Sequence, residues 1–142
     1  MKMKNPSKEH ERLVGELEET ATASGYIENI NGDSLGFPDI LRLNHPKQQM
    51  VAGIAVDASI EKIISKETRE RLTTTLTGLK GSFSQHGKDS VCLILATNDL
   101  AYAKHLASSL PDLFTSEGIP TNEIPKFGVK TKNGNTFIVH QA

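Results

Sequence analysis

Hydrophobic residues recur along the chain with two different spacings, which predict helices and strands in a definite order. Near the N-terminus, Leu13, Leu17 and Ala21 follow one another at four-residue steps, which predicts a helix over residues 8–24 that ends at Gly25. A similar period predicts two more helices, with Pro111 as a point where the second of them kinks or breaks. These further helices cover residues 65–85 and 100–117.

Two segments, Met50–Val56 and Val91–Thr97, are continuously apolar, which predicts strands that are buried on both faces. The other predicted strands are 26–30, 35–43 and a closing hairpin over 127–139 that turns at Asn133-Gly134. The order of elements is then helix, three strands, helix, strand, helix and hairpin. It predicts an α/β (or α+β) fold with a mixed central sheet flanked by helices. The two apolar strands should be parallel neighbours joined by a crossover helix.

Composition narrows the class of protein. The chain has 142 residues, which suits one domain over 1–142, with residues 1–6 expected to be flexible. A formal net charge of -1 excludes a polybasic chain, and a single cysteine excludes an internal disulfide. No apolar run approaches the roughly 20 residues that cross a bilayer, so we expect a cytoplasmic protein with no membrane partner.

Two aspartates are the strongest candidates for chemistry. Asp39 follows Pro38 at the start of a predicted strand, and Asp57 comes where the apolar strand 50–56 ends. If these neighbouring strands place both carboxylates at one sheet edge, the pair would hold Mg²⁺ or Mn²⁺. Glu16 and Glu18, which flank the apolar stripe of the first helix, are candidates for a supporting carboxylate.

Ordinary structural roles are the alternative for each of these residues. Asp39 also suits a turn, because Pro-Asp is common turn chemistry. Asp57 also suits the N-cap of a helix that starts at Ala58. The two glutamates also suit a solvated helix face.

These residues resemble the PD-(D/E)xK nuclease family over residues 11–97. A helix that bears a glutamate is followed by Pro38-Asp39, by Asp57 at the end of the next strand, and by a helix and a strand. Three short stretches are especially similar to resolvase-like members: Gly25-Tyr26-Ile27, Gly32-Asp33-Ser34 and Phe37-Pro38-Asp39-Ile40-Leu41. The resemblance implies a restriction-endonuclease-like core of αβββαβ order, with the last helix and hairpin added. It also implies that Asp39 and Asp57 bind the metal.

The chain departs from this family at one motif position. The family has a lysine two residues after the second acid, where it helps to activate water, and this chain has Ser59. Lys62 is the nearest substitute. Two functions therefore stay open: a metal-dependent nuclease that hydrolyses nucleic-acid phosphodiesters, or a catalytically inactive nuclease fold that serves as a nucleic-acid or protein binding and assembly module.

Basic residues give a candidate nucleic-acid surface, with DNA preferred to RNA as the partner. The candidates are Lys62, Lys66, Arg69, Arg71 and Lys80 on or before the second helix and Lys126, Lys130 and Lys132 on the final hairpin. The alternative is a normal solvated surface, because Glu61, Glu67 and Glu70 interrupt the helical set. Because so small a domain exposes little binding surface, we also expect a homodimer or a larger assembly.

Other reactive residues point to no further site. The five histidines show no metal-ligand spacing, and Cys92 lies inside an apolar strand, which is typical of a core thiol. The pattern Gly-x-Ser-x-Gly occurs over residues 32–36, but it leads into a predicted strand rather than the helix that a serine nucleophile requires.

Overall fold

The computed structural model describes residues 8–29, 38–44, 46–60, 63–86, 91–124, 126–131 and 136–140. Its helices are α1 (Lys8–Ala23), α2 (Lys66–His86) and α3 (Leu100–Ser116), with a short 3-10 turn at Thr121–Glu123. Its strands are β1 (Glu28–Asn29), β2 (Ile40–Asn44), β3 (Gln49–Val56), β4 (Val91–Thr97), β5 (Lys126–Thr131) and β6 (Thr136–His140). None of the described helices is long and apolar enough to cross a membrane.

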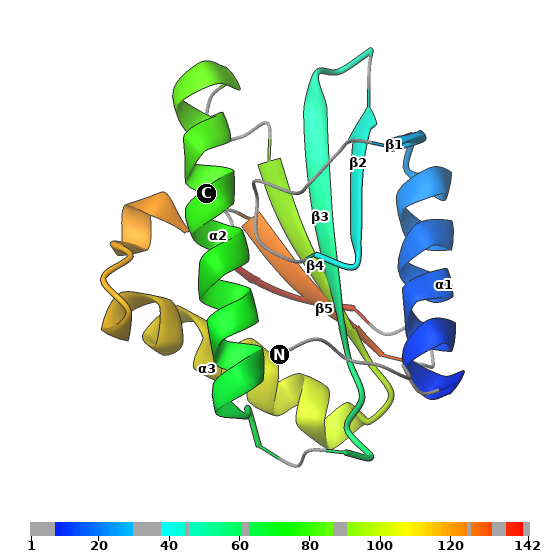
Figure 1. Ribbon diagram of the computed structural model, residues 1–142, viewed down its shortest axis with the longest axis vertical. Coiled ribbons are helices and arrows are strands. Elements are labelled where there is room, and N and C mark those ends of the chain that lie inside the picture. Colours follow the sequence, from blue (N-terminus) through cyan, green and yellow to red (C-terminus); the bar gives the residue numbers. More distant parts are fainter. Residues whose placement is uncertain are drawn as a thin grey trace.

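The strands form one mixed sheet in the order β1-β2-β3-β4-β5-β6. The first three strands are antiparallel neighbours, β3, β4 and β5 are parallel, and β6 returns antiparallel to β5. Helix α1 lies on one face of the sheet, and α2 and α3 lie on the other (Figure 1). The predicted α/β class, the mixed sheet and the parallel crossover between β3 and β4 are therefore confirmed.

The apolar stripe of α1 packs on the middle of the sheet. Leu13, Leu17 and Ala21 are at most 1% exposed and contact Val51 and Ala55 of β3, among other small apolar residues. Small side chains on the strands let the helix lie close to the sheet. Burying the two leucines is worth about 1.5–3 kcal/mol each, so packing rather than intrinsic helix propensity holds α1 in place.

The opposite face carries the larger core. Side chains at alternating positions of β3 and β4, such as Ile54, Leu93 and Leu95, meet α2 and α3 there and are fully buried. Phe114 of α3 and Phe127 of β5 pack edge to face, with ring centroids 6.2 Å apart. Both apolar strands are therefore buried on their two faces, as their uninterrupted hydrophobic sequences predict.

Local signals in the sequence mark the ends of the helices. Gly25 has a φ of 92°, and the amides of Gly25 and Tyr26 donate to the carbonyls of Thr22 and Ala21, which closes the last turn of α1. The hydroxyl of Ser65 accepts from the amide of Thr68 at 3.1 Å and caps α2.

The structure differs from the predicted elements in three places. Strand β2 begins at Ile40, so Pro38 and Asp39 come before it rather than inside it. No helix starts at Ala58, where the chain forms a turn instead. Helix α3 continues through Pro111 without a break. The predicted turn at Asn133-Gly134 and the glycines of residues 32–36 lie outside the described residues.

We predict that Gly53→Ala destabilises the protein. A Cβ at this position of β3 would lie 2.7 Å from Cγ1 of Ile40 and 3.3 Å from Cδ1 of Leu17, so the packing of α1 on the sheet must open. We expect a loss of about 1–3 kcal/mol in the free energy of unfolding, measured by chemical denaturation. The matched control is Gly15→Ala on α1, where nothing lies within 4 Å. This control should gain about 0.5–1 kcal/mol from helix propensity, and an equal loss in both variants would contradict the packing.

Candidate functional site

The carboxylate of Asp39 joins three structural elements at the start of β2. One oxygen, Oδ2, accepts the backbone amide of Ala55 at 2.7 Å and lies 3.2 Å from Nη2 of Arg71 on α2. The other, Oδ1, accepts from Nε2 of His10 on α1 at 3.1 Å. The backbone amide of Asp39 donates to the carbonyl of Gly53 at 2.8 Å. The side chain therefore takes the place of a strand carbonyl and also ties both helical layers to the sheet.

Asp57 directly follows the end of β3 and lies beyond the residue of this strand that the Asp39 side chain binds. Ile40, opposite Gly53, is the first residue of β2 that pairs with β3, and the side chain of Asp39 just before it accepts the amide of Ala55. Asp57 is two residues beyond Ala55, about 7 Å along the chain at roughly 3.3 Å per residue. The residue beside the Asp39 carboxylate is therefore an alanine and not an acid.

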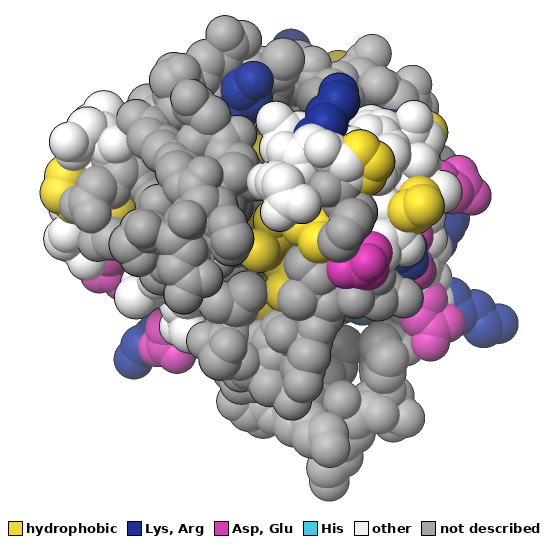
Figure 2. All heavy atoms as spheres, turned by 90° about the horizontal axis from the view of Figure 1, so that it is seen from above, with side chains coloured by type: hydrophobic (Ala, Val, Ile, Leu, Met, Phe, Trp, Pro, Cys, Tyr) yellow, Lys and Arg dark blue, Asp and Glu magenta, His cyan; other side chains and the backbone are white. Residues whose placement is uncertain are grey.

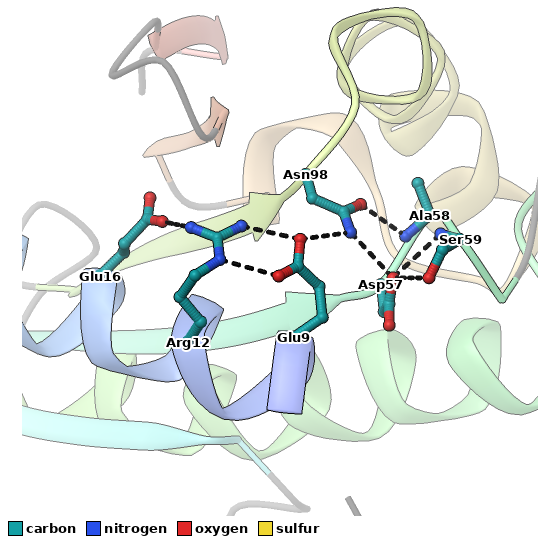
Figure 3. Close-up of polar contacts among 7 residues, drawn as sticks. All are labelled: Glu9, Arg12, Glu16, Asp57, Ala58, Ser59 and Asn98. Carbon is teal, nitrogen blue, oxygen red and sulfur yellow. Dashed lines mark hydrogen bonds and ion pairs between the residues drawn. The ribbon is translucent and has the colours of Figure 1, made fainter. Parts of the chain in front are cut away.

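Asp57 bonds on the other side of β3, toward β4. It is 7% exposed, and its Oδ1 accepts from the amide and the hydroxyl of Ser59 and from Nδ2 of Asn98 at 2.9 Å (Figure 3). Oδ1 of Asn98 in turn accepts the amide of Ala58 at 2.9 Å. These bonds fix the turn that follows β3 to the residue that follows β4. Asp57 therefore caps a turn. The alternative prediction, in which it is the N-cap of a helix that starts at Ala58, is wrong.

The α1 glutamate that shares a hydrogen-bond donor with Asp57 is Glu9, about two turns or more before the two candidates. Its Oε2 accepts from the same Asn98 amide nitrogen at 2.8 Å, and both of its oxygens bind Arg12 (Figure 3). Glu16 pairs with the other side of Arg12. The hydrogen bond to Glu9 is the largest cause that raises the pKa of Arg12 above its ordinary value, so this guanidinium stays charged. Glu18 points elsewhere and binds Arg42 of β2 at 2.7 Å.

Three residues that bind the two aspartates were not predicted as part of the site: Glu9, His10 and Asn98. Arg71 was predicted only as one of the basic residues that could contact a nucleic acid. A signal for Asn98 exists, because it follows β4 as Asp57 follows β3, and parallel strands bring their carboxyl ends together. No comparable signal marks His10 or Arg71. Their contacts depend on how two helices lie on opposite faces of the sheet.

These donors do not fit a metal shared by the two aspartates. Asp39 already accepts three bonds on about four lone-pair sites, and the charge of Arg71 beside it repels a divalent cation. Within the described part of the chain, no group of three or more His, Cys, Asp or Glu side chains is placed to hold a metal ion.

The candidate basic residues whose side chains the structure describes lie on two faces of the sheet. Lys66 and Arg69 are exposed on α2, whereas Lys130 is half-buried on β5 in register with Ala96, on the face that α1 covers. The sheet therefore separates the two groups. Lys80 lies within α2. Lys62 and Lys132 lie outside the described residues.

The structure is compatible with Cys92 as a core thiol. Cys92 is half-buried against the α1 face of the core, beside Tyr26 and in register with Lys126. Burial raises its pKa, while the hydrogen bond with Tyr26 and the charge of Lys126 act weakly in the opposite direction.

Comparison with known protein families, curated proteins and solved structures gives no match to this chain. The function must therefore be inferred from the geometry of this site.

We predict that Asn98→Asp destabilises the protein at neutral pH. The change replaces an amide donor with a third carboxylate that faces Glu9 and Asp57. We expect a loss of about 2 kcal/mol or more in chemical denaturation. This loss should shrink in mildly acidic buffer, because repulsion raises the pKa of a clustered carboxyl and protonation then relieves it. Asn122→Asp, at an exposed position, is the control and should stay within about 0.5 kcal/mol. A loss that does not depend on pH would contradict the network.

We predict slow alkylation of Cys92 by iodoacetamide at neutral pH. Its raised pKa leaves little thiolate, and only the thiolate reacts. The labelling rate, followed by mass spectrometry, should stay well below that of glutathione and increase in alkaline buffer or in denaturant. A rate equal to that of glutathione in the folded protein would show that the thiol is activated.

Proposed function

We propose that the chain is a catalytically inactive domain with a nuclease-like fold, which acts as a binding and assembly module. The order of elements supports the nuclease-like core. Helix α1 is followed by the antiparallel strands β1, β2 and β3, then by α2 and the parallel strand β4, which is the αβββαβ order. Helix α3 and the strands β5 and β6 extend this core.

One observation carries the choice of binding over hydrolysis: the carboxylate of Asp39 is neutralised by Arg71 and lies beside Ala55. A hydrolytic metal needs carboxylates that converge without a competing cation. Here the neighbouring strand offers Asp39 the backbone amide of Ala55, and the next acid along the chain, Asp57, binds Asn98. Ser59 stands where the motif lysine belongs and is itself a donor to Asp57.

The charge distribution favours a protein partner over a nucleic acid. Basic residues on α2 alternate with the exposed acids Glu67 and Glu70, and Lys130 lies across the sheet from them. On the face shown in Figure 2, described side chains of both charges lie among hydrophobic and polar ones. Phosphate contacts require a continuous basic surface. We therefore do not expect DNA binding, and the tests below treat it as the alternative outcome.

The proposal is tested by metal binding and cleavage together. We expect no change in Tm when millimolar Mg²⁺ or Mn²⁺ is added, and no cleavage of plasmid, single-stranded or branched DNA or of RNA. An increase in Tm with Mn²⁺ that Asp39→Ala or Asp57→Ala abolishes, with cleavage lost in the same variants, would establish the nuclease instead.

We predict that Asp39→Ala strongly destabilises the metal-free protein. The change leaves the amide of Ala55 without its side-chain acceptor and removes the Asp39 carboxylate from Arg71 and His10, so we expect a loss of about 2–4 kcal/mol in chemical denaturation. The control is Asp112→Ala, an exposed aspartate on α3, which should change stability by less than about 0.5 kcal/mol. If Asp39→Ala instead stabilises the metal-free protein, its carboxylate is under repulsion from like charges, as in a metal site.

A further inference from the structure

The two faces of the sheet are covered unequally. Strands lie about 4.8 Å apart and a helix is about 10 Å wide, so one helix covers roughly two strands. Helices α2 and α3 share one face, and α3 reaches β4, β5 and β6. On the other face α1 is the one described helix, and it packs on β2, β3 and β4. In the described part of the chain, no helix lies over β5 and β6 on this face.

Two lysines stand on this uncovered half of the sheet. Lys126 and Lys130 are in register with Cys92 and Ala96, which belong to the α1 face. Lys126 is exposed and Lys130 is half-buried, and neither has a described carboxylate as an ion-pair partner. Four residues of strand separate them by about 13 Å.

The outward face of α1 carries two acids with nearly the same separation. Glu11 and Glu19 are exposed, and eight residues of helix separate them by about 12 Å. Between them is Gly15, where an added Cβ would meet no atom of another part of the chain within 4 Å. The middle of this helix face therefore carries no side chain at Gly15, and one acid lies toward each end of the helix. A lysine, Lys8, precedes both acids at the start of the helix.

We propose that a second copy of this chain covers the uncovered half of the sheet with its own α1. In a two-fold dimer, each protomer's α1 would lie on the partner's β5, between the two sheets, so the contact is isologous and closed. Helix α1 begins at the carboxyl end of the parallel strands, where Glu9 meets Asn98. A two-fold axis along the helix direction therefore brings Glu11 toward Lys130 and Glu19 toward Lys126 across the interface. This inference deepens the proposed function by naming its partner and surface.

The test is charge reversal followed by light scattering and sedimentation over a range of protein concentrations. The wild type should be dimeric, and Glu11→Lys with Glu19→Lys should raise the dimer dissociation constant by about tenfold or more. Adding Lys126→Glu and Lys130→Glu to this variant should restore the dimer. The control is Glu67→Lys with Glu70→Lys on α2, which reverses the same charge on exposed acids of another face and should leave the dimer intact.

A second variant avoids any change to the half-buried lysine. Gly15→Gln fills open space on α1, so the monomer should fold normally by circular dichroism while the dimer dissociates. A monomeric wild type would overturn the dimer, as would a quadruple charge variant that stays dissociated. If the wild type is monomeric and Lys126→Glu with Lys130→Glu abolishes binding to single-stranded DNA, the occupant is a nucleic acid. None of these outcomes involves Asp39, so failure of the dimer is distinguishable from failure of the non-catalytic assignment.

Discussion

The bonds of the Asp39 carboxylate constrain how the three layers of this protein meet. Just before the start of β2, the side chain of Asp39 accepts the amide of Ala55 in place of a strand carbonyl. The same carboxylate binds His10 from one helical layer and Arg71 from the other. All three residues are largely buried, so these bonds form where water competes poorly and charge interactions are strong. The arrangement fixes α1 and α2 relative to the strand between them.

A second polar network, two residues beyond Ala55, also joins separate elements of the fold. Asn98 binds Asp57, Glu9 and the amide of Ala58, and thereby joins the ends of β3 and β4 to the start of α1. Arg12 binds Glu9 and so compensates one of the two carboxylates that meet at Asn98. Both aspartates thus hold neighbouring elements of the fold together through hydrogen bonds. This is why the geometry favours a binding module over a hydrolase, although the order of its elements suits a nuclease-like core.

Much of the architecture could be predicted from the sequence because it follows from local patterns. The four-residue steps of Leu13, Leu17 and Ala21 and the apolar runs of β3 and β4 each need only short-range periodicity. The start of β2 could not be placed in this way, since it depends on the pairing of Ile40 with Gly53. The hydrogen bond from its amide places Ala55, and not Asp57, beside the Asp39 carboxylate. Spacing along the chain predicts that two acids reach the same edge of a sheet, but not which neighbour each one faces.

The most direct measurement of the central claim is the carboxyl ¹³C chemical shift of Asp39 as Mg²⁺ is added. If Arg71, His10 and the amide of Ala55 already occupy this carboxylate, its resonance should stay unchanged at millimolar Mg²⁺, and the guanidinium signals of Arg71 should remain protected from exchange. A saturable shift of the Asp39 resonance, with loss of protection at Arg71, would show that the metal displaces the arginine and that the site is catalytic after all.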